Sequence, residues 1–498
     1  MIDMFYKSYL YNLIRKLYMV ILASFQETFL YKMFMADIDN RSLENSFVSK
    51  IVVGIKTMLG ALSSFITDSF TYKMLHRFCA KTTVTDIISS SKILNLFKVS
   101  AEGYSFSFLL FLLLLFFAGL FPTMAVVFLA LFIMVFALLE KDFNQTLTKT
   151  KPVFTDVLIA FYMLNLILGL YLSKDPSKFN IFLVYFVFVS LYFAVRYFIS
   201  SERKMILSVS YFTLSGIFVC LYGLYQYLTG SYETTTWTDT QLFSDIEGRI
   251  YATFQNPNVF GEYLLFLIPI SLAMVIISKQ VIHKIIYGGA LALAAICLIL
   301  TYSRGCWLGL MGGMAIFVLL LYKKYLIPFV ALLPFAVFMI PKNILNRFQS
   351  IGNLKDGSTA FRVYVWRGTV AMLEKIWPIG AGIGTKSFEN AYAPYAYADV
   401  MAPHSHSLYF HLLSETGLFG ILVFVALCYF IIRQLLMVFK HSKNRRLQIL
   451  AVAFVAGFTG FLIQGFFDNT FYNYRMYMLF FAIVSLAASL YGVAERKA

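Results

Sequence analysis

The chain has 498 residues, of which 60% are hydrophobic and 18% are aromatic. Soluble domains are only about 45–50% apolar, so this composition excludes a string of soluble domains and predicts an all-α polytopic membrane protein. The formal net charge of +16 does not indicate nucleic acid, because basic residues placed between spanning segments usually record membrane orientation. We therefore expect membrane lipids, and no nucleic acid, as partners.

Residues 1–103 differ from the rest of the chain, because charged residues such as Lys7, Arg15 and Lys16 recur among closely spaced aromatics. That mixture favours helices that lie on an anionic membrane surface over helices that cross it. The stretch 51–65 is the one marginal spanning candidate, with Lys56 near its middle. We predict a cytoplasmic or interfacial amphipathic region here.

From residue 104 to residue 492, apolar runs approach the length of about 20 residues that crosses a bilayer. Turn-forming residues such as Pro122 and Gly230 separate them. We predict about twelve transmembrane helices, at 104–121, 122–140, 153–172, 179–199, 205–229, 259–278, 283–303, 304–322, 325–341, 413–437, 447–467 and 471–492.

The connecting loops test this map through the distribution of positive charge. Loops after even-numbered segments contain Lys141, Lys149, Lys151, Arg203, Lys204, Lys279, Lys284, Lys323, Lys324, Lys440, Lys443, Arg445 and Arg446. Loops after odd-numbered segments carry few basic residues, with Lys174 and Lys178 as a weak exception. The positive-inside rule then predicts that both termini are cytoplasmic, as in a multi-pass protein of the bacterial inner membrane.

Two predicted outer loops are long, at 230–258 and, between the ninth and tenth helices, at 342–412. Long loops are uncommon unless they carry function. The polar residues predicted at the outer face include four arginines and three histidines: Arg249, Arg304, Arg362, Arg367, His404, His406 and His411.

Arg304 stands at the junction of two apolar segments with no acidic neighbour in sequence. Two interpretations stay open, an anchor that reaches lipid head groups and a guanidinium held against a substrate phosphate. Gly305, Gly309 and Gly313 form two overlapping GxxxG steps, which permit close helix packing and would hold Arg304 in place.

Arg362 and Trp366 are four residues apart and so share a helical face, whereas Arg367 points elsewhere. The glycine run at 380–384 lacks the Lys-Ser/Thr ending of a phosphate-binding loop, which favours a tight turn.

His404 and His406 offer two chemistries. A histidine titrates near neutral pH, so either residue can act as a general base. As an HxH pair they are also an alternative metal site, but no carboxylate nearby in sequence completes it, and Glu415 is expected on the next helix. We expect no metal here.

These residues resemble the O-antigen ligase and polymerase superfamily of bacterial membrane glycan-assembly proteins. The similar stretches run in order from about 248 to 420: Gly248-Arg249 through Asn256-Pro-Asn258, Ser303-Arg304-Gly305, Arg362-x-x-x-Trp366, Pro378 to Gly384, and His404-Ser-His406 through Gly417. One departure is Ser407, where the family commonly has Asn.

The resemblance implies transfer of a glycan from an undecaprenyl-diphosphate-linked oligosaccharide to a glycan or lipid acceptor outside the membrane. Arginine forks suit the diphosphate leaving group. On this view Arg304 and Arg362, with Arg249 and Arg367, bind the diphosphate. His406 or His404 is the base, and Trp366, Glu415, Asn256 and Asn258 support the site. The reaction would invert the anomeric centre without a metal or other cofactor.

Four alternatives remain at this stage. A ligase would use the same donor and a terminal lipid or protein acceptor. We favour a polymerase, because the lysine- and aromatic-rich chain resembles low-GC Gram-positive relatives, which lack a lipopolysaccharide acceptor. A transporter predicts charged or broken helices at the midplane, where this chain has few charges. A metal-dependent glycosyltransferase would use carboxylates such as Asp245 and Glu247, and a non-enzymatic scaffold would need no site.

Overall fold

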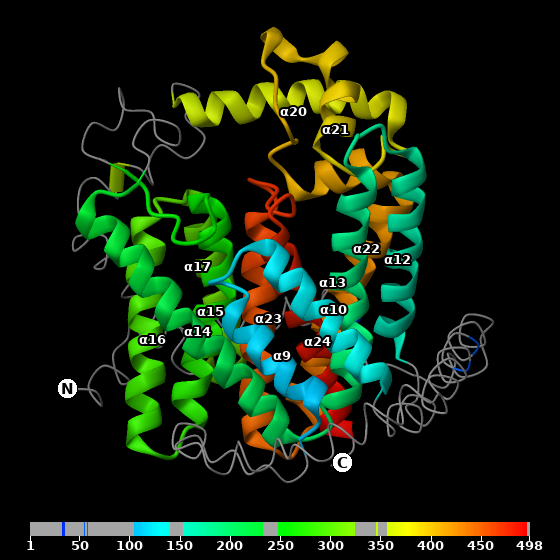
Figure 1. Ribbon diagram of the computed structural model, residues 1–498. Coiled ribbons are helices and arrows are strands. Elements are labelled where there is room, and N and C mark those ends of the chain that lie inside the picture. The colour runs from blue at the N-terminus through cyan, green and yellow to red at the C-terminus, as the bar shows by residue number, and fades with distance from the viewer. Residues whose placement is uncertain are drawn as a thin grey trace.

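The computed structural model describes residues 104–139, 153–232, 248–323 and 356–495, together with positions 32–34, 54, 57, 345 and 346 (Figure 1). Within these residues every regular element is a helix, and no strand occurs. In chain order the helices are α9 (Phe106–Phe117), α10 (Thr123–Leu139), α12 (Phe154–Leu172), α13 (Lys178–Phe198), α14 (Glu202–Thr229), α15 (Pro257–Ile277), α16 (Val281–Leu300), α17 (Arg304–Leu321), α20 (Gly357–Ile376), α21 (Thr385–Tyr392), the 3-10 turns η2 (Ala393–Tyr395) and η3 (Tyr397–Asp399), α22 (Leu408–His441), α23 (Arg445–Gln464) and α24 (Tyr474–Glu495).

Nine of the described helices, α12 to α17 and α22 to α24, are long and apolar enough to cross a membrane. Eleven of the twelve predicted segments coincide with helices, but α9 and α10 have only 12 and 17 residues, so the count of twelve is not confirmed. Several predictions fall on residues that the structure does not describe. These are the spanning segment 325–341, the amphipathic region 1–103 apart from isolated positions, and the carboxylates Asp245 and Glu247.

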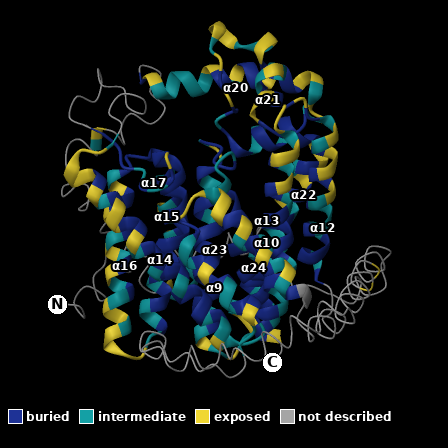
Figure 2. Ribbon diagram, viewed as in Figure 1, coloured by how far each residue is buried: buried dark blue, intermediate teal, exposed yellow. Residues whose placement is uncertain are grey.

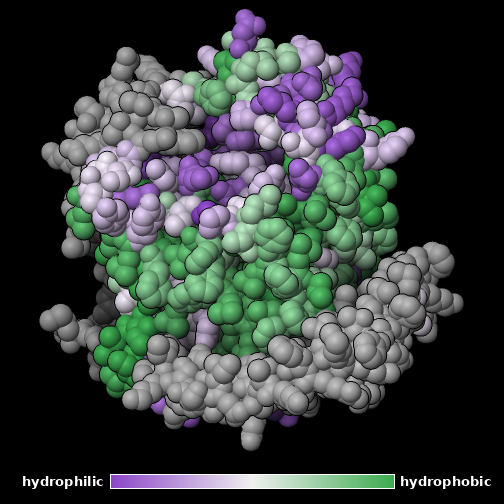
Figure 3. All heavy atoms as spheres, in the orientation of Figure 1, coloured by the Kyte–Doolittle hydropathy of each residue, from purple (hydrophilic) through white to green (hydrophobic). Residues whose placement is uncertain are grey.

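The surface agrees with a multi-pass membrane protein. On the face shown in Figure 3, apolar side chains form a belt across the middle of the bundle, and hydrophilic residues gather at the end that carries α20 and α21. Buried residues concentrate where the helices face one another (Figure 2). Because apolar side chains also face outward on α10, α12 and α16, the helices have the exterior that lipid requires.

Close packing between α17 and α23 orients the start of α17. A Cβ atom added to Gly309 would lie 2.6 Å from the carbonyl oxygen of Gly460 on α23, and one on Gly313 would collide with the backbone of Ala456. The expected small-residue contact is therefore present. It holds the first residue of α17, Arg304, next to the last turn of α23.

The predicted outer loop 342–412 is largely helical where the structure describes it. Helix α20 lies across the end of the bundle, above α21 (Figure 1). Arg362 and Trp366 both line one cavity, which confirms that they share a helical face.

The glycine run forms the predicted tight turn. Gly380, Gly382 and Gly384 have φ angles of 85°, 89° and 105°, a region that glycine adopts at low cost. The amides of residues 381, 382 and 384 donate to the carbonyl oxygens of Ser414 and Glu415 and to the carboxylate of Glu415. Since these amides already have partners, the turn docks onto α22 and is no phosphate cradle.

Candidate functional site

The polar site lies where the N-termini of α15 and α17 meet the C-terminus of α23, beneath α20. The residues that begin the two helices belong to it. Asn256 caps α15 by accepting from the amide of Asn258 at 2.8 Å, a favoured way to satisfy a helix N-terminus. Ser303 precedes α17. Local capping therefore places both asparagines and Arg304 at one end of the bundle.

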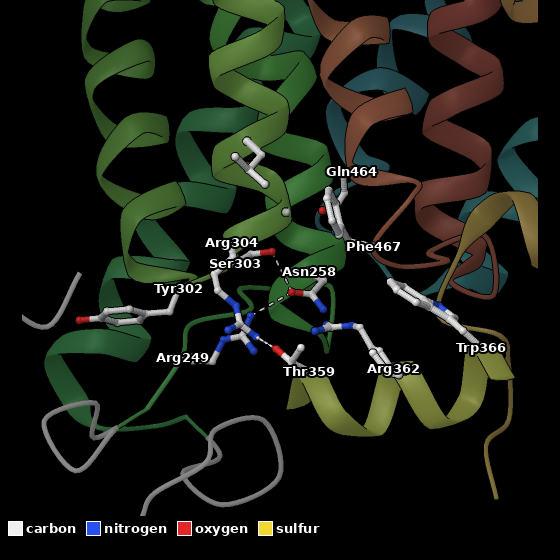
Figure 4. Close-up of a pocket in the computed structure, with 13 residues that line it drawn as sticks. Arg249, Asn258, Tyr302, Ser303, Arg304, Thr359, Arg362, Trp366, Gln464 and Phe467 are labelled. Carbon is white, nitrogen blue, oxygen red and sulfur yellow. Dashed lines mark hydrogen bonds between the residues drawn. The ribbon is translucent and has the colours of Figure 1, made fainter. Parts of the chain in front are cut away.

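Three arginines converge on a cavity of about 880 Å³, the arginine cavity (Figure 4). Arg249 comes from the loop before α15, Arg304 from the start of α17 and Arg362 from α20. Its other lining residues include Asn258, Tyr302, Trp366, Gln464 and Phe467. Guanidinium groups are suited to bind phosphate oxygens, and three of them line this one space.

Arg249 is buried and anchored to the two helix starts. Its Nε donates to the carbonyl oxygen of Thr301 at 2.7 Å, and an Nη donates to Asn258 Oδ1 at 2.9 Å. The same amide oxygen accepts from the Ser303 hydroxyl at 2.8 Å. Asn258 thereby joins the loop arginine to α17.

Arg304 is 8% exposed and forms an ion pair with the buried Asp356, at 2.5 Å. It also donates to Ser358 and Thr359, at 2.9 and 3.1 Å. The lipid-anchor interpretation does not fit this burial. Arg304 instead ties α17 to the first turn of α20, through a carboxylate 52 residues away in sequence.

Arg362 is held much less tightly than the other two arginines. Its one described side-chain hydrogen bond runs from Nη1 to Ser358 at 3.5 Å, and its buried Nε has no partner in the described part of the chain. A buried donor without a partner is costly, and a phosphate oxygen in the cavity would supply one. Arg362 is therefore the arginine best prepared to receive a ligand.

A second cavity, of about 1470 Å³, adjoins the first and shares Arg249, Asn258 and Arg362 with it. We call it the histidine cavity, because His404, His406 and Asp468 line it together with Tyr472 and Asn256. The two cavities together connect the arginine cluster to the histidines.

His406 is oriented from three sides. Its Nδ1 lies 3.0 Å from Asp468 Oδ1, and Asp468 Oδ2 accepts from Asn258 Nδ2 at 2.6 Å. Trp366 donates from Nε1 to the carbonyl oxygen of His406 at 3.2 Å, and the Phe361 ring meets the imidazole edge-on. The φ angle of His406 is 49°, a strained value that persists only where surroundings impose it.

Asp468 sets the tautomer of His406. Burial alone would raise the pKa of Asp468, but the hydrogen bond and charge of His406, with Arg362 nearby, lower this pKa below its ordinary value. An ionised carboxylate only accepts hydrogen bonds. Such a carboxylate favours the tautomer that carries the ring proton on Nδ1, which leaves the lone pair of a neutral imidazole on Nε2.

His404 is buried and packs flat on Tyr472, with ring centroids 4.7 Å apart. Burial, and next the charge of His406, lower the pKa of His404 well below its usual value. Its Nδ1 accepts from the amide of His406 at 3.3 Å, and Asn256 donates to the Tyr472 hydroxyl at 2.8 Å. His404 is thus a neutral ring that supports the backbone of His406.

The sequence argued against a metal because no carboxylate lies near His404 and His406 along the chain, but the fold brings Asp468 to them. Ligand atoms of His404, His406 and Asp468 all lie within 4.8 Å of one another, so the third ligand comes from the loop between α23 and α24. His406 Nδ1 and His404 Nδ1 already make the hydrogen bonds given above. Imidazole nitrogens and a carboxylate oxygen are ligands that suit a transition metal. Whether activity depends on such an ion is tested by adding a chelator.

The other predicted residues lie outside both cavities. Arg367 stacks over the Tyr397 ring at 5.0 Å, and Glu415 holds the glycine turn and faces His411 at 3.3 Å. Ser407 begins α22, with its hydroxyl 3.5 Å from the carbonyl oxygen of Gly465. We do not include these residues in the proposed site.

Asp468, Asp356 and Tyr472 were missed by sequence reasoning. Asp468 carried a usable signal, because it is the only acidic residue between positions 447 and 492 and it interrupts the last two apolar segments. Intramembrane or membrane-edge carboxylates are functional candidates by default.

The helical architecture is that of a multi-pass membrane protein, with arginines and histidines gathered in adjoining cavities at one end of its bundle. The family model described as O-antigen ligase matches residues 289–425, a stretch that holds Arg304, Arg362, His404 and His406. This match supports membership of the O-antigen ligase and polymerase family and a glycan transfer of that general type. No curated protein matches the chain.

Proposed function

We propose that the protein transfers a glycan from an undecaprenyl-diphosphate-linked donor to an acceptor hydroxyl at the outer face of the bacterial inner membrane, polymerising a surface polysaccharide. The observation that carries this proposal is the junction of the two cavities, which places an arginine cluster and an Asp-oriented histidine around one shared wall. Donor diphosphate in one cavity and acceptor in the other would meet at Arg362.

The arginine cavity suits the leaving group. As the bond from the anomeric carbon to the phosphate oxygen breaks, that oxygen takes the electron pair and negative charge grows on the diphosphate. Fixed cations at this position stabilise that charge, which is usually the largest catalytic contribution. Arg362 and Arg249 would contact the diphosphate, and Arg304 would add charge while holding α20.

The histidine cavity suits the acceptor. The acceptor oxygen forms its bond to the anomeric carbon from the face opposite the leaving group, so the anomeric configuration inverts. His406 Nε2 takes the hydroxyl proton, and the ionised Asp468 stabilises the resulting imidazolium, as in other oriented histidine bases. Protein groups thereby supply both charge stabilisation and proton transfer.

Reconstitution tests this proposal directly. Purified protein given a lipid-linked repeat should form a ladder of longer glycans whose new linkages have the inverted anomeric configuration by NMR. A single addition to a lipid or protein acceptor would instead support a ligase. Since arginines are proposed to bind the diphosphate, the rate should survive EDTA.

Loss of activity on chelation, restored by Mg²⁺, Mn²⁺ or Zn²⁺, would contradict the metal-independent mechanism. It would assign the His404–His406–Asp468 group, or Asp245 and Glu247, to an ion. Transport of the glycan without any new linkage would contradict glycan transfer itself and favour a transporter.

Membrane orientation has its own test. The end opposite the site carries Arg203, Lys279, Lys443 and Arg446, which supports a cytoplasmic location by the positive-inside rule. Cysteines at the exposed positions Asn390 and Lys443 should then differ: an impermeant maleimide added to intact cells should label Asn390→Cys and spare Lys443→Cys.

The background for this labelling is low. Cys220, Cys297, Cys306 and Cys428 are buried and unpaired, and Cys79 can be replaced by serine. The opposite labelling pattern would invert the map and place the site in the cytoplasm.

A further inference from the structure

A third cavity, of about 1210 Å³, lies at the end of the bundle opposite the site, and no step of the proposed reaction uses it. We call it the inner-end cavity. Helix α15 connects the two ends, because Pro257 and Asn258 start it at the site and Met274 and Ile277 line this cavity. Its 21 residues rise about 31 Å at about 1.5 Å per residue, which is close to the bilayer core.

The lining of the inner-end cavity is strongly basic. Arg203, Lys279 and Arg446 contribute permanent positive charges, His283 adds a titratable ring, and none of the described lining residues is acidic. Glu202 lies beside the cavity and pairs with Arg446 at 3.5 Å. Among the described lining residues, three are cationic and none carries a carboxylate.

The same cavity also has apolar lining residues. Ile206, Leu207, Met274 and Ile277 contribute to it. The Tyr104 hydroxyl, from another lining residue, is buried without a hydrogen-bond partner in the described part of the chain. Basic and apolar groups together fit an amphiphile with a phosphate head group better than a free anion.

We infer that the inner-end cavity binds the phosphate head group of an anionic phospholipid, with its acyl chains along the apolar wall. Basic pockets between spanning helices at the cytoplasmic side recognise such head groups. Placement in the inner leaflet rests on the orientation proposed above. Binding itself depends only on the cavity.

The test measures lipid affinity of the detergent-purified, delipidated full chain by its thermal unfolding midpoint, which rises with any ligand that binds the folded state. Phosphatidylglycerol should raise the midpoint more than phosphatidylcholine with the same acyl chains, and glycerol phosphate should have little effect. Lys279→Gln and Arg446→Gln should each weaken phosphatidylglycerol binding by about fivefold, the effect expected for one cation near a charged lipid.

Matched controls remove the same charge outside the cavity. Lys284 on α16, five residues after Lys279, and Arg445 on α23, next to Arg446, are exposed and do not line the cavity. Lys284→Gln and Arg445→Gln should therefore leave the affinity unchanged. The exposed Lys279 is the main variant, because replacing Arg446 also removes the ion pair with Glu202.

Three results would overturn the inference: equal binding of phosphatidylcholine, equal binding of glycerol phosphate, or equal losses in the control variants. They would indicate respectively a nonspecific apolar site, a site for soluble phosphate and a diffuse charge effect. Glycan transfer is not the readout, so failure here is distinct from failure of the proposed function.

Discussion

Replacement of His406 by alanine is expected to lower the rate of glycan transfer by about 10²- to 10⁴-fold, the usual contribution of a general base. The alanine variant keeps the arginine cavity, because His406 does not line it. Donor binding should therefore stay near the wild-type value while turnover falls. Initial rates and donor affinity, measured on the reconstituted protein, separate the two effects.

Asp468→Asn tests the orientation of this base. An amide nitrogen placed at Oδ1 would donate to Nδ1 and move the ring proton to Nε2, which leaves no lone pair towards the acceptor. The rate should fall by at least about tenfold, with donor binding again little changed. His441→Ala, at the far end of α22, is the matched histidine control and should retain activity.

His404 distinguishes the two candidate bases. We expect His404→Ala to reduce activity less than His406→Ala, because His404 supports the backbone through the amide of His406. Activity that survives His406→Ala and disappears in His404→Ala would assign the base to His404. Activity that survives both changes would show that the proposed mechanism does not apply.

Arg362→Lys is expected to lower glycan transfer by about 10²-fold or more, comparable to removing one donor that stabilises a developing negative charge. Lysine keeps the charge but lacks the planar fork that binds two phosphate oxygens. The buried Nε of Arg362 has no hydrogen-bond partner among the residues that the structure describes, so the change should cost little folded-state stability. Weaker donor binding should accompany the lower rate.

Arg367→Lys is the internal control, since Arg367 lies on the same helix but stacks on Tyr397 outside both cavities. Arg304→Lys should also reduce transfer, and it should lower the thermal unfolding midpoint because it weakens the buried pair with Asp356. Equal losses for Arg362→Lys and Arg367→Lys would contradict the assignment of the diphosphate to the arginine cavity.

The sequence by itself determined the helices and supplied the candidate arginines and histidines. Apolar runs of about 20 residues form helices in lipid because each segment must satisfy its own backbone hydrogen bonds. The GxxxG steps of α17 and the glycine turn before α21 could also be predicted, because each depends on residues close together in the sequence. For this reason eleven predicted segments coincide with described helices, whereas length alone did not establish how many of them cross the membrane.

Only the tertiary structure decided which polar groups meet. Asp356 reaches Arg304 across 52 positions and Asp468 reaches His406 across 62, while Arg367, one of the four candidate arginines, faces away. These pairings depend on how α17, α20 and α23 pack, and a single sequence carries no signal for contacts between distant segments. Periodicity specifies the face of each helix, but the partner of that face is chosen by packing of the whole bundle.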